Sequence, residues 1–179
     1  MKNKDKRDTF WNGTTIGSEP ALVPWLHNHG SLTQSIQQRC KNFAVRPLRS
    51  SLARIAYDES ALLNIAPRQL AYSREVFLYA NNQAVVFAHS ICAAKHLRGA
   101  WAALDGLGNK PLGAMLFGYP LVERRPLRFK ALHQHHPLYQ SASASEKLPP
   151  TLWARRSLFY LHDAPLLVTE VFLPGILKL

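Results

Sequence analysis

The sequence predicts a single α+β domain, in which a few helices pack on one side of an antiparallel β-sheet of about six strands. Three observations lead to this prediction. Runs of β-branched and aromatic residues are separated by turn signals, and helical periodicity is confined to short segments. The 179 residues, 47% of them hydrophobic, suit one domain with a sizeable core. The chain also shows no internal repeat and no clear domain boundary.

The segment 165–174 is the clearest strand, because apolar residues lie between two prolines without a helical period. Both of its faces are apolar, so the strand should be buried on both sides. The carboxylate of Glu170 would then be buried away from water, where a charge needs a partner or a changed protonation state. Two interpretations remain open: a structural ion pair with one of the arginines, or a carboxylate that faces a buried polar ligand.

That strand is expected to form the second arm of a β-hairpin. A strand over 152–161 leads into it through a tight turn at 162–164. Arg155 and Arg156 are consecutive in the first arm, so their side chains point to opposite faces of the sheet. One arginine is expected at the surface. The other would line a cavity or pair with Glu170, with Arg156 or another arginine as the structural partner.

Another hairpin is expected earlier in the chain, with strands over 73–80 and 84–93 joined at an Asn-Asn turn signal. Arg74 begins an apolar row on one face of its strand, much as Glu170 stands within one. His89, in the returning strand, is interpreted as a satisfied or half-exposed histidine.

The remaining elements are shorter and less regular. Helices are predicted at 32–39, where Ser31 can act as the N-cap, at 95–107 and at 111–117. One or two strands are predicted at 43–56 and a bent strand at 119–132. The segment 61–70 is expected to be a connection with a turn of helix. Residues 1–20 are polar and rich in turn formers, which predicts a flexible N-terminal arm in front of the domain at 21–179.

The segment 133–150 is predicted to be a long, polar and mobile loop. It starts with His133, His135 and His136 and continues into a stretch rich in Ser, Ala and Pro. A metal site needs convergent ligands that further hydrogen bonds hold rigidly. A solvated loop is therefore favoured over a metal site at these histidines.

The chain carries a formal net charge of +11, which attracts anions such as nucleic acid, acidic lipid or a small polyanionic substrate. Its basic residues are spread along the sequence, and no nucleic-acid-binding motif is present, so no nucleic-acid partner is expected. The two isolated cysteines, Cys40 and Cys92, suit a reducing compartment. Without a signal-peptide pattern or a long apolar run, the sequence predicts a cytoplasmic protein with no membrane insertion.

Four motifs occur in the order and spacing that characterise one enzyme family. They are REVFL at 74–78, KPLGAMLF at 110–117, WARRS at 153–157 and PLLVTEVFLP at 165–174. Together they resemble chorismate pyruvate-lyase, and the resemblance spans about 25–174. The tripeptide Ser-Leu-Thr at 31–33 also resembles the Ser-Met-Thr stretch of that family, with Leu32 in place of the methionine.

The resemblance implies a six-stranded antiparallel sheet that encloses the product under helical flaps. It implies a monomeric lyase that converts chorismate to 4-hydroxybenzoate and pyruvate for ubiquinone synthesis, with no cofactor and no metal. Its ligand contacts would be Arg74 at the ring carboxylate, Glu170 at the ring hydroxyl, and Leu112 and Leu32 mainly through backbone groups. Arg74 and Glu170 would be the catalytic residues.

The sequence departs from the family pattern at two places. The segment 133–150 is longer than expected and should be a surface insertion, and His89 stands where an arginine is expected. The alternative function is a non-catalytic domain that binds an aromatic acid, like the ligand-sensing domains of some bacterial transcription regulators. The polar N-terminal 30 residues lack a helix-turn-helix pattern, which disfavours a regulator.

Overall fold

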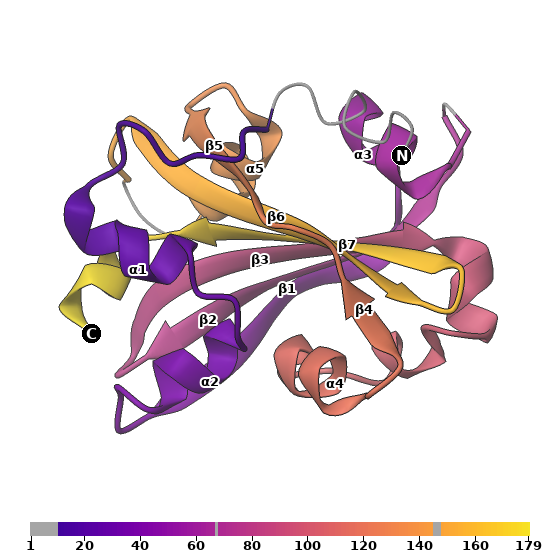
Figure 1. Ribbon diagram of the computed structural model, residues 1–179, viewed down its shortest axis with the longest axis horizontal. Helices are drawn as coiled ribbons and strands as arrows, with labels where there is room; N and C mark the ends of the chain where they lie inside the picture. The colour runs from indigo at the N-terminus through magenta and orange to yellow at the C-terminus, as the bar shows by residue number, and fades with distance from the viewer. Residues whose placement is uncertain (1–10, 67, 145–147) are drawn as a thin grey trace.

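The computed structural model describes residues 11–66, 68–144 and 148–179. Its strands form one antiparallel seven-stranded sheet in the order β1-β2-β3-β7-β6-β4, and β5 also pairs with β6 (Figure 1). The strands are β1 Phe43–Ala53, β2 Ala71–Ala80, β3 Gln83–Ala93, β4 Val122–Arg124, β5 Arg128–His133, β6 Thr151–Leu161 and β7 Ala164–Phe172. The α+β class and the antiparallel sheet are therefore confirmed.

Short helices connect the strands. The α-helices are α1 Val23–Leu26, α2 Leu32–Gln37, α3 Tyr57–Leu63, α4 Leu112–Gly118 and α5 Pro137–Ala142, and the 3-10 helices are η2 Pro20–Leu22, η3 Ala94–Arg98, η4 Ala102–Leu104 and η5 Pro174–Lys178. None of the helices in the described residues combines the length and the apolar character that a membrane crossing requires.

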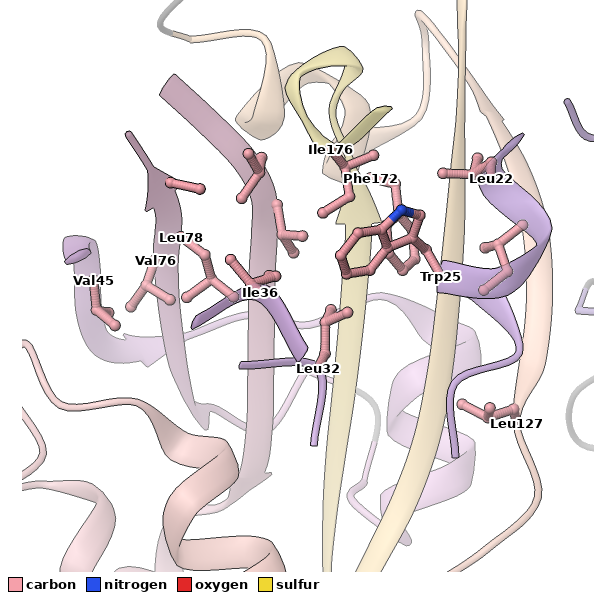
Figure 2. Packing of buried hydrophobic residues seen from close by; sticks show 14 of the residues in the cluster. Leu22, Trp25, Leu32, Ile36, Val45, Val76, Leu78, Leu127, Phe172 and Ile176 are labelled. Atoms are coloured by element: carbon pink, nitrogen blue, oxygen red, sulfur yellow. The ribbon is translucent and has the colours of Figure 1, made fainter. Parts of the chain in front are cut away.

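Helices cover both faces of the sheet, and not one face as expected. Leu32 and Ile36 of α2 pack against Val76 of β2 and Phe172 of β7 (Figure 2). The next residue along β2, Phe77, points to the other face and joins a cluster that includes α5. Because successive strand residues alternate between faces, β7 is buried on both sides, as its sequence predicts. The helices α2 and α4 cover the face that carries Arg74, and α3 and α5 cover the opposite face.

Both predicted hairpins are confirmed. Asn81 and Asn82 have positive φ angles of 49° and 65°, which suit the two-residue turn between β2 and β3. In the other hairpin the turn also has two residues, since Leu161 pairs with Ala164. The strand at 43–53 is continuous, with an irregular register between Pro47 and Arg49. Ser31 caps α2, where its Oγ accepts a hydrogen bond from the backbone N–H of Gln34 at 3.3 Å.

Two predicted elements are divided in the structure. The helix expected at 95–107 is replaced by η3 and η4, because Gly99 lies between them with ψ of −116°, outside the helical range. Its apolar residues Trp101 and Leu104 still pack inward. The bent strand expected at 119–132 is two strands, β4 and β5, separated at Pro126, which has no N–H for a ladder.

The sequence-based prediction misplaced one helix, α3, and missed another, α5. The helix α3 covers 57–63 and so begins before the predicted connection at 61–70. The helix α5 lies inside the segment 133–150, with Pro137 at its first turn and the His136 side chain accepting from the N–H of Leu138 at 3.2 Å. Leu138 and neighbours of α5 are buried, so this part of the segment is a packed helix and not a polar loop.

The predicted arm at 1–20 is only partly described. Residues 1–10 lie outside the described residues. Trp11 is buried against the core, and Asn12 forms an isolated antiparallel bridge with Phe129 of β5. Trp11 and Asn12 are therefore packed on the sheet, whereas residues 13–21 are mostly exposed.

Candidate active site

A cavity lies between the sheet and the helices α2 and α4, and it includes all four residues that the sequence predicts as ligand contacts. Arg74 comes from β2, Glu170 from β7, Leu112 from the first turn of α4 and Leu32 from the first turn of α2. The cavity encloses about 600 Å³ of space between atoms, part of it open to solvent.

The strand register explains why the cavity exists at this place. Arg74 pairs with Ser90 of β3, and Glu170 pairs with Ala88 of the same strand. The two charged residues are thus two strands apart and displaced by two residues, which ideal sheet geometry converts to about 12 Å between their Cα atoms. Ala88 and Ser90 lie on β3 between Arg74 and Glu170. Because their side chains are small, they leave space above the sheet for the cavity.

Arg74 is a buried guanidinium with no anionic partner in the described part of the chain. Only 2% of the residue is exposed, and its Nη2 donates to the carbonyl oxygens of Gly108 at 2.9 Å and Lys110 at 3.1 Å. Burial lowers the pKa of Arg74. The carbonyl contacts hold the side chain at the start of α4, where its remaining N–H groups can receive an anion.

Glu170 forms an ion pair, as one of its two interpretations predicts, and it also lines the cavity. Its Oε2 accepts a hydrogen bond from Nε of Arg155 at 2.6 Å. Nη1 of Arg155 donates to the carbonyl oxygens at the end of α1, which belong to Trp25, Leu26 and Asn28. Arg155 therefore joins α1 to the sheet and orients Glu170 towards the cavity.

The expectation that Arg155 or Arg156 is a surface charge is wrong, because both arginines are buried. Arg156 points to the other face and donates to Oδ2 of Asp58 at 2.7 Å. Helices cover both faces of the sheet at this point, which leaves neither side chain in water. The ion-pair partner of Glu170 is Arg155 and not Arg156.

Arg124 is a cavity residue that sequence reasoning missed. It lies on β4, and its Nη1 donates to the carbonyl oxygen of His29 at 2.7 Å. Its guanidinium carbon is 5.5 Å and 5.3 Å from the ring centroids of Phe117 and Phe159. Burial, with a further contribution from the nearby Arg155, lowers the pKa of Arg124 to about 10. The pairing of Arg124 with Phe159 of β6 places it on the sheet edge, and no local pattern in the sequence indicates this pairing.

On the opposite face, His89 lies between two carboxylates and takes no part in the cavity. Its Nε2 is 3.4 Å from Oε1 of Glu59, and its Nδ1 is 3.2 Å from Oε1 of Glu75. Glu75 also accepts from Arg49 at 2.9 Å. His89 is thus buried and not half-exposed, and it is held by the charges of the two carboxylates, since its buried Nδ1 lies close to Glu75 without a well-aligned hydrogen bond. The side chain at this position points to the face of the sheet opposite Arg74.

The histidines of the segment 133–150 make local contacts. His133 lies 3.1 Å from the Thr151 hydroxyl, and His136 caps α5. Across residues 11–66, 68–144 and 148–179, no three His, Cys, Asp or Glu side chains gather as metal ligands would.

The surroundings of His89 predict a loss of stability at alkaline pH. Burial alone would lower the pKa of His89, but the hydrogen bonds and charges of Glu59 and Glu75 raise it to about 9. Because the folded-state pKa lies above the ordinary value, the stabilisation is complete below about pH 6.5 and is lost as the pH rises through about 9, with a size of about 3 kcal/mol.

The measurement is the melting temperature between pH 6 and 9.5. We expect the wild type to lose stability over this range relative to His89→Gln, whose melting temperature should be lower at pH 6 and change less. His135→Gln, at an exposed histidine, is the matched control and should follow the wild type. Parallel pH profiles for wild type and His89→Gln would contradict the assignment.

The fold and the cavity together define a class: a one-sheet α+β domain with a positively charged cavity between the sheet and two helices. The chain belongs to the chorismate lyase family, whose pattern it matches over residues 6–178. A protein of Nitrosospira multiformis named "probable chorismate pyruvate-lyase" is 53% identical over 171 residues, which cover 94% of this chain and 95% of that protein. A protein of the same name from Nitrosomonas europaea is 48% identical over 170 residues, covering 94% and 96%.

Solved structures with the same fold include transcription regulators. PhnF from Mycobacterium smegmatis superposes with a TM-score of 0.60 at 12% identity, over 83% of this chain and 66% of that one. The effector domain of the same protein gives a TM-score of 0.57 at 11% identity, over 82% and 90%. At these identities the likeness concerns the fold alone.

Proposed function

We propose that this protein is a chorismate pyruvate-lyase, which cleaves chorismate to 4-hydroxybenzoate and pyruvate. The observation that carries the proposal is the charge of the cavity. Arg74, Arg124 and Arg155 bring three guanidinium groups to it, and Glu170 brings one carboxylate. The resulting charge of +2 matches chorismate, which carries two carboxylates.

Arg74 and Glu170 mark the two ends of the ring site. The guanidinium of Arg74 binds the ring carboxylate, since its N–H groups are not engaged by another anion within the described residues. The Glu170 carboxylate, held by Arg155, accepts a hydrogen bond from the ring hydroxyl at the far end. Leu112 and Leu32 lie in the first turns of α4 and α2, where backbone N–H groups without helical partners can bind the ring carboxylate.

The reaction breaks the ether bond between the ring and the enolpyruvyl oxygen, and the electron pair stays on that oxygen. The ring carbon that bears the hydroxyl loses its hydrogen, and its C–H electrons complete the aromatic ring. A proton reaches the enolpyruvyl methylene carbon, so that pyruvate forms. Aromatisation supplies the driving force, which means that the protein has to hold a reactive conformer and stabilise charge on the departing oxygen.

The metabolic role of the protein follows from its product. 4-Hydroxybenzoate would supply ubiquinone synthesis. We infer a cytoplasmic protein that acts as a monomer on a small molecule, without a nucleic-acid partner, since its two cysteines are isolated and its basic residues are spread along the chain.

The direct test adds chorismate to the purified, folded protein and follows both products. Wild-type protein should release 4-hydroxybenzoate and pyruvate in equal amounts. A folded protein that forms neither product would refute the proposed activity.

Arg74→Gln should weaken the binding of chorismate and of 4-hydroxybenzoate together. A charge-assisted contact to a carboxylate is lost, which costs about 2–4 kcal/mol of binding. Titration calorimetry with 4-hydroxybenzoate and the KM for chorismate measure the effect. Arg98→Gln is the matched control, because this exposed arginine of η3 does not line the cavity. Product affinity within a factor of about two of the wild type would show that Arg74 is not the anchor.

The second candidate is a non-catalytic domain that binds an aromatic acid. The fold it shares with the effector domain of a transcription regulator favours this reading. Such a domain would bind 4-hydroxybenzoate through Arg74 and Glu170 without consuming chorismate, so the product assay separates the two functions.

A further inference from the structure

The cavity contains more positive charge than one ring carboxylate requires. Arg155 is committed to Glu170 through Nε and to backbone carbonyls through Nη1. Arg74 and Arg124 have no ion pair in the described part of the chain. Two guanidinium groups therefore remain for the ligand, on opposite sides of β7 in the sheet order.

Arg124 is held in place by its contacts, but one of its N–H groups has no hydrogen-bond acceptor. Its Nη1 donates a hydrogen bond to the carbonyl oxygen of His29, and the rings of Phe117 and Phe159 flank the guanidinium. Its Nε is fully buried and has no hydrogen-bond partner. A buried N–H without an acceptor is costly, and a ligand that brings an acceptor removes that cost. The unsatisfied group belongs to a residue that lines the cavity, so the missing acceptor can come from a bound anion.

Arg124 is also placed near the reacting end of the ring. Its charge interacts with both Glu170 and Arg155, the pair that marks the hydroxyl position. In chorismate the enolpyruvyl ether is attached to the ring carbon next to the one that bears the hydroxyl. The enolpyruvyl carboxylate must then lie beside Glu170, at the end of the ring opposite to Arg74.

We infer that Arg124 binds the enolpyruvyl carboxylate of the substrate. This assignment rests on the proposed function. It gives Arg124 a contact that exists with chorismate and is absent with 4-hydroxybenzoate, which has only the ring carboxylate. Arg124 therefore selects the substrate over the ring product and holds the departing group while the ether bond breaks. When pyruvate leaves, the contact is lost and the ring product keeps only Arg74 and Glu170.

The main test is Arg124→Gln. We expect kcat/KM for chorismate to fall by about 10- to 100-fold, the effect of losing one charge-assisted contact, while the Kd of 4-hydroxybenzoate stays within a factor of about three. Arg124→Lys keeps the charge and should recover part of the loss. Arg125→Gln is the matched control: the neighbouring side chain is half-exposed, does not line the cavity and should leave both quantities unchanged.

A binding experiment on the wild type avoids any dependence on turnover. Two analogues of 4-hydroxybenzoate carry a substituent next to the hydroxyl: a carboxymethoxy group in one and an uncharged methoxy group in the other. The wild type should bind the carboxymethoxy analogue about tenfold more tightly, and Arg124→Gln should remove this preference. This result stands even if the wild type forms no pyruvate, so failure of the inference and failure of the proposed activity are distinguishable.

Two outcomes would overturn the inference. One is equal affinity of the wild type for the two analogues. The other is a Kd of 4-hydroxybenzoate that rises in Arg124→Gln as much as KM for chorismate does, in a variant whose melting temperature is unchanged. That pattern would mean that Arg124 binds the ring carboxylate or shapes the pocket as a whole.

Discussion

Glu170→Gln is expected to lower kcat for chorismate by about 10²–10⁴-fold, the range typical of a general acid–base group. The substitution keeps the shape but removes the negative charge. A ring hydroxyl that donates to a carboxylate becomes richer in electrons, which stabilises the positive charge that develops on the ring as the enolpyruvyl oxygen departs. A neutral amide oxygen is a weaker acceptor, so the transition state loses more than the ground state. Binding of 4-hydroxybenzoate should change much less than kcat.

The fold of this variant should persist. Nη1 of Arg155 keeps its carbonyl partners at the end of α1, and the amide oxygen of glutamine can still accept from Nε. Glu123→Gln is the matched control, because Glu123 is an exposed carboxylate on β4 that should have no effect on kcat. A kcat for Glu170→Gln within about threefold of the wild type would show that the charge is not used in the reaction.

Arg155→Met should have the largest effect on stability. The methionine fills the volume of the arginine stem but leaves Glu170 without its ion-pair partner and the carbonyls of Trp25, Leu26 and Asn28 without a donor. Breaking a buried pair from one side costs about 3–5 kcal/mol. For a chain of this length the melting temperature should fall by roughly 6–20 °C.

A double-mutant cycle separates the two roles of Arg155. Glu170→Gln combined with Arg155→Met removes the stranded carboxylate, so the double variant should be more stable than Arg155→Met alone. Arg125→Met is the control for loss of charge at a half-exposed arginine and should leave the melting temperature nearly unchanged. If Arg155→Met melts within about 2 °C of the wild type, Arg155 does not join α1 to the sheet.

The sequence by itself determined the strands and the face on which each key residue lies. Alternation along β2 and β7 placed Arg74 and Glu170 on apolar rows, and both residues do line one cavity. These predictions succeeded because the period of a strand is local: side chains alternate whatever the partner strand is. The motifs predicted the family for a similar reason, since they are read from short segments of the chain.

Only the tertiary structure decided which residues meet. The predicted three-residue turn at 162–164 would set Arg156 across from Glu170, whereas the observed turn of two residues sets Arg155 there. A shift of one residue in the register exchanges the faces of the sheet, so the partner of Glu170 depends on the turn and not on the strand. Arg124 was missed because its position depends on β4 pairing with the edge of β6. The charge of the cavity depends on contacts between segments far apart in the sequence, and no local pattern contains that information.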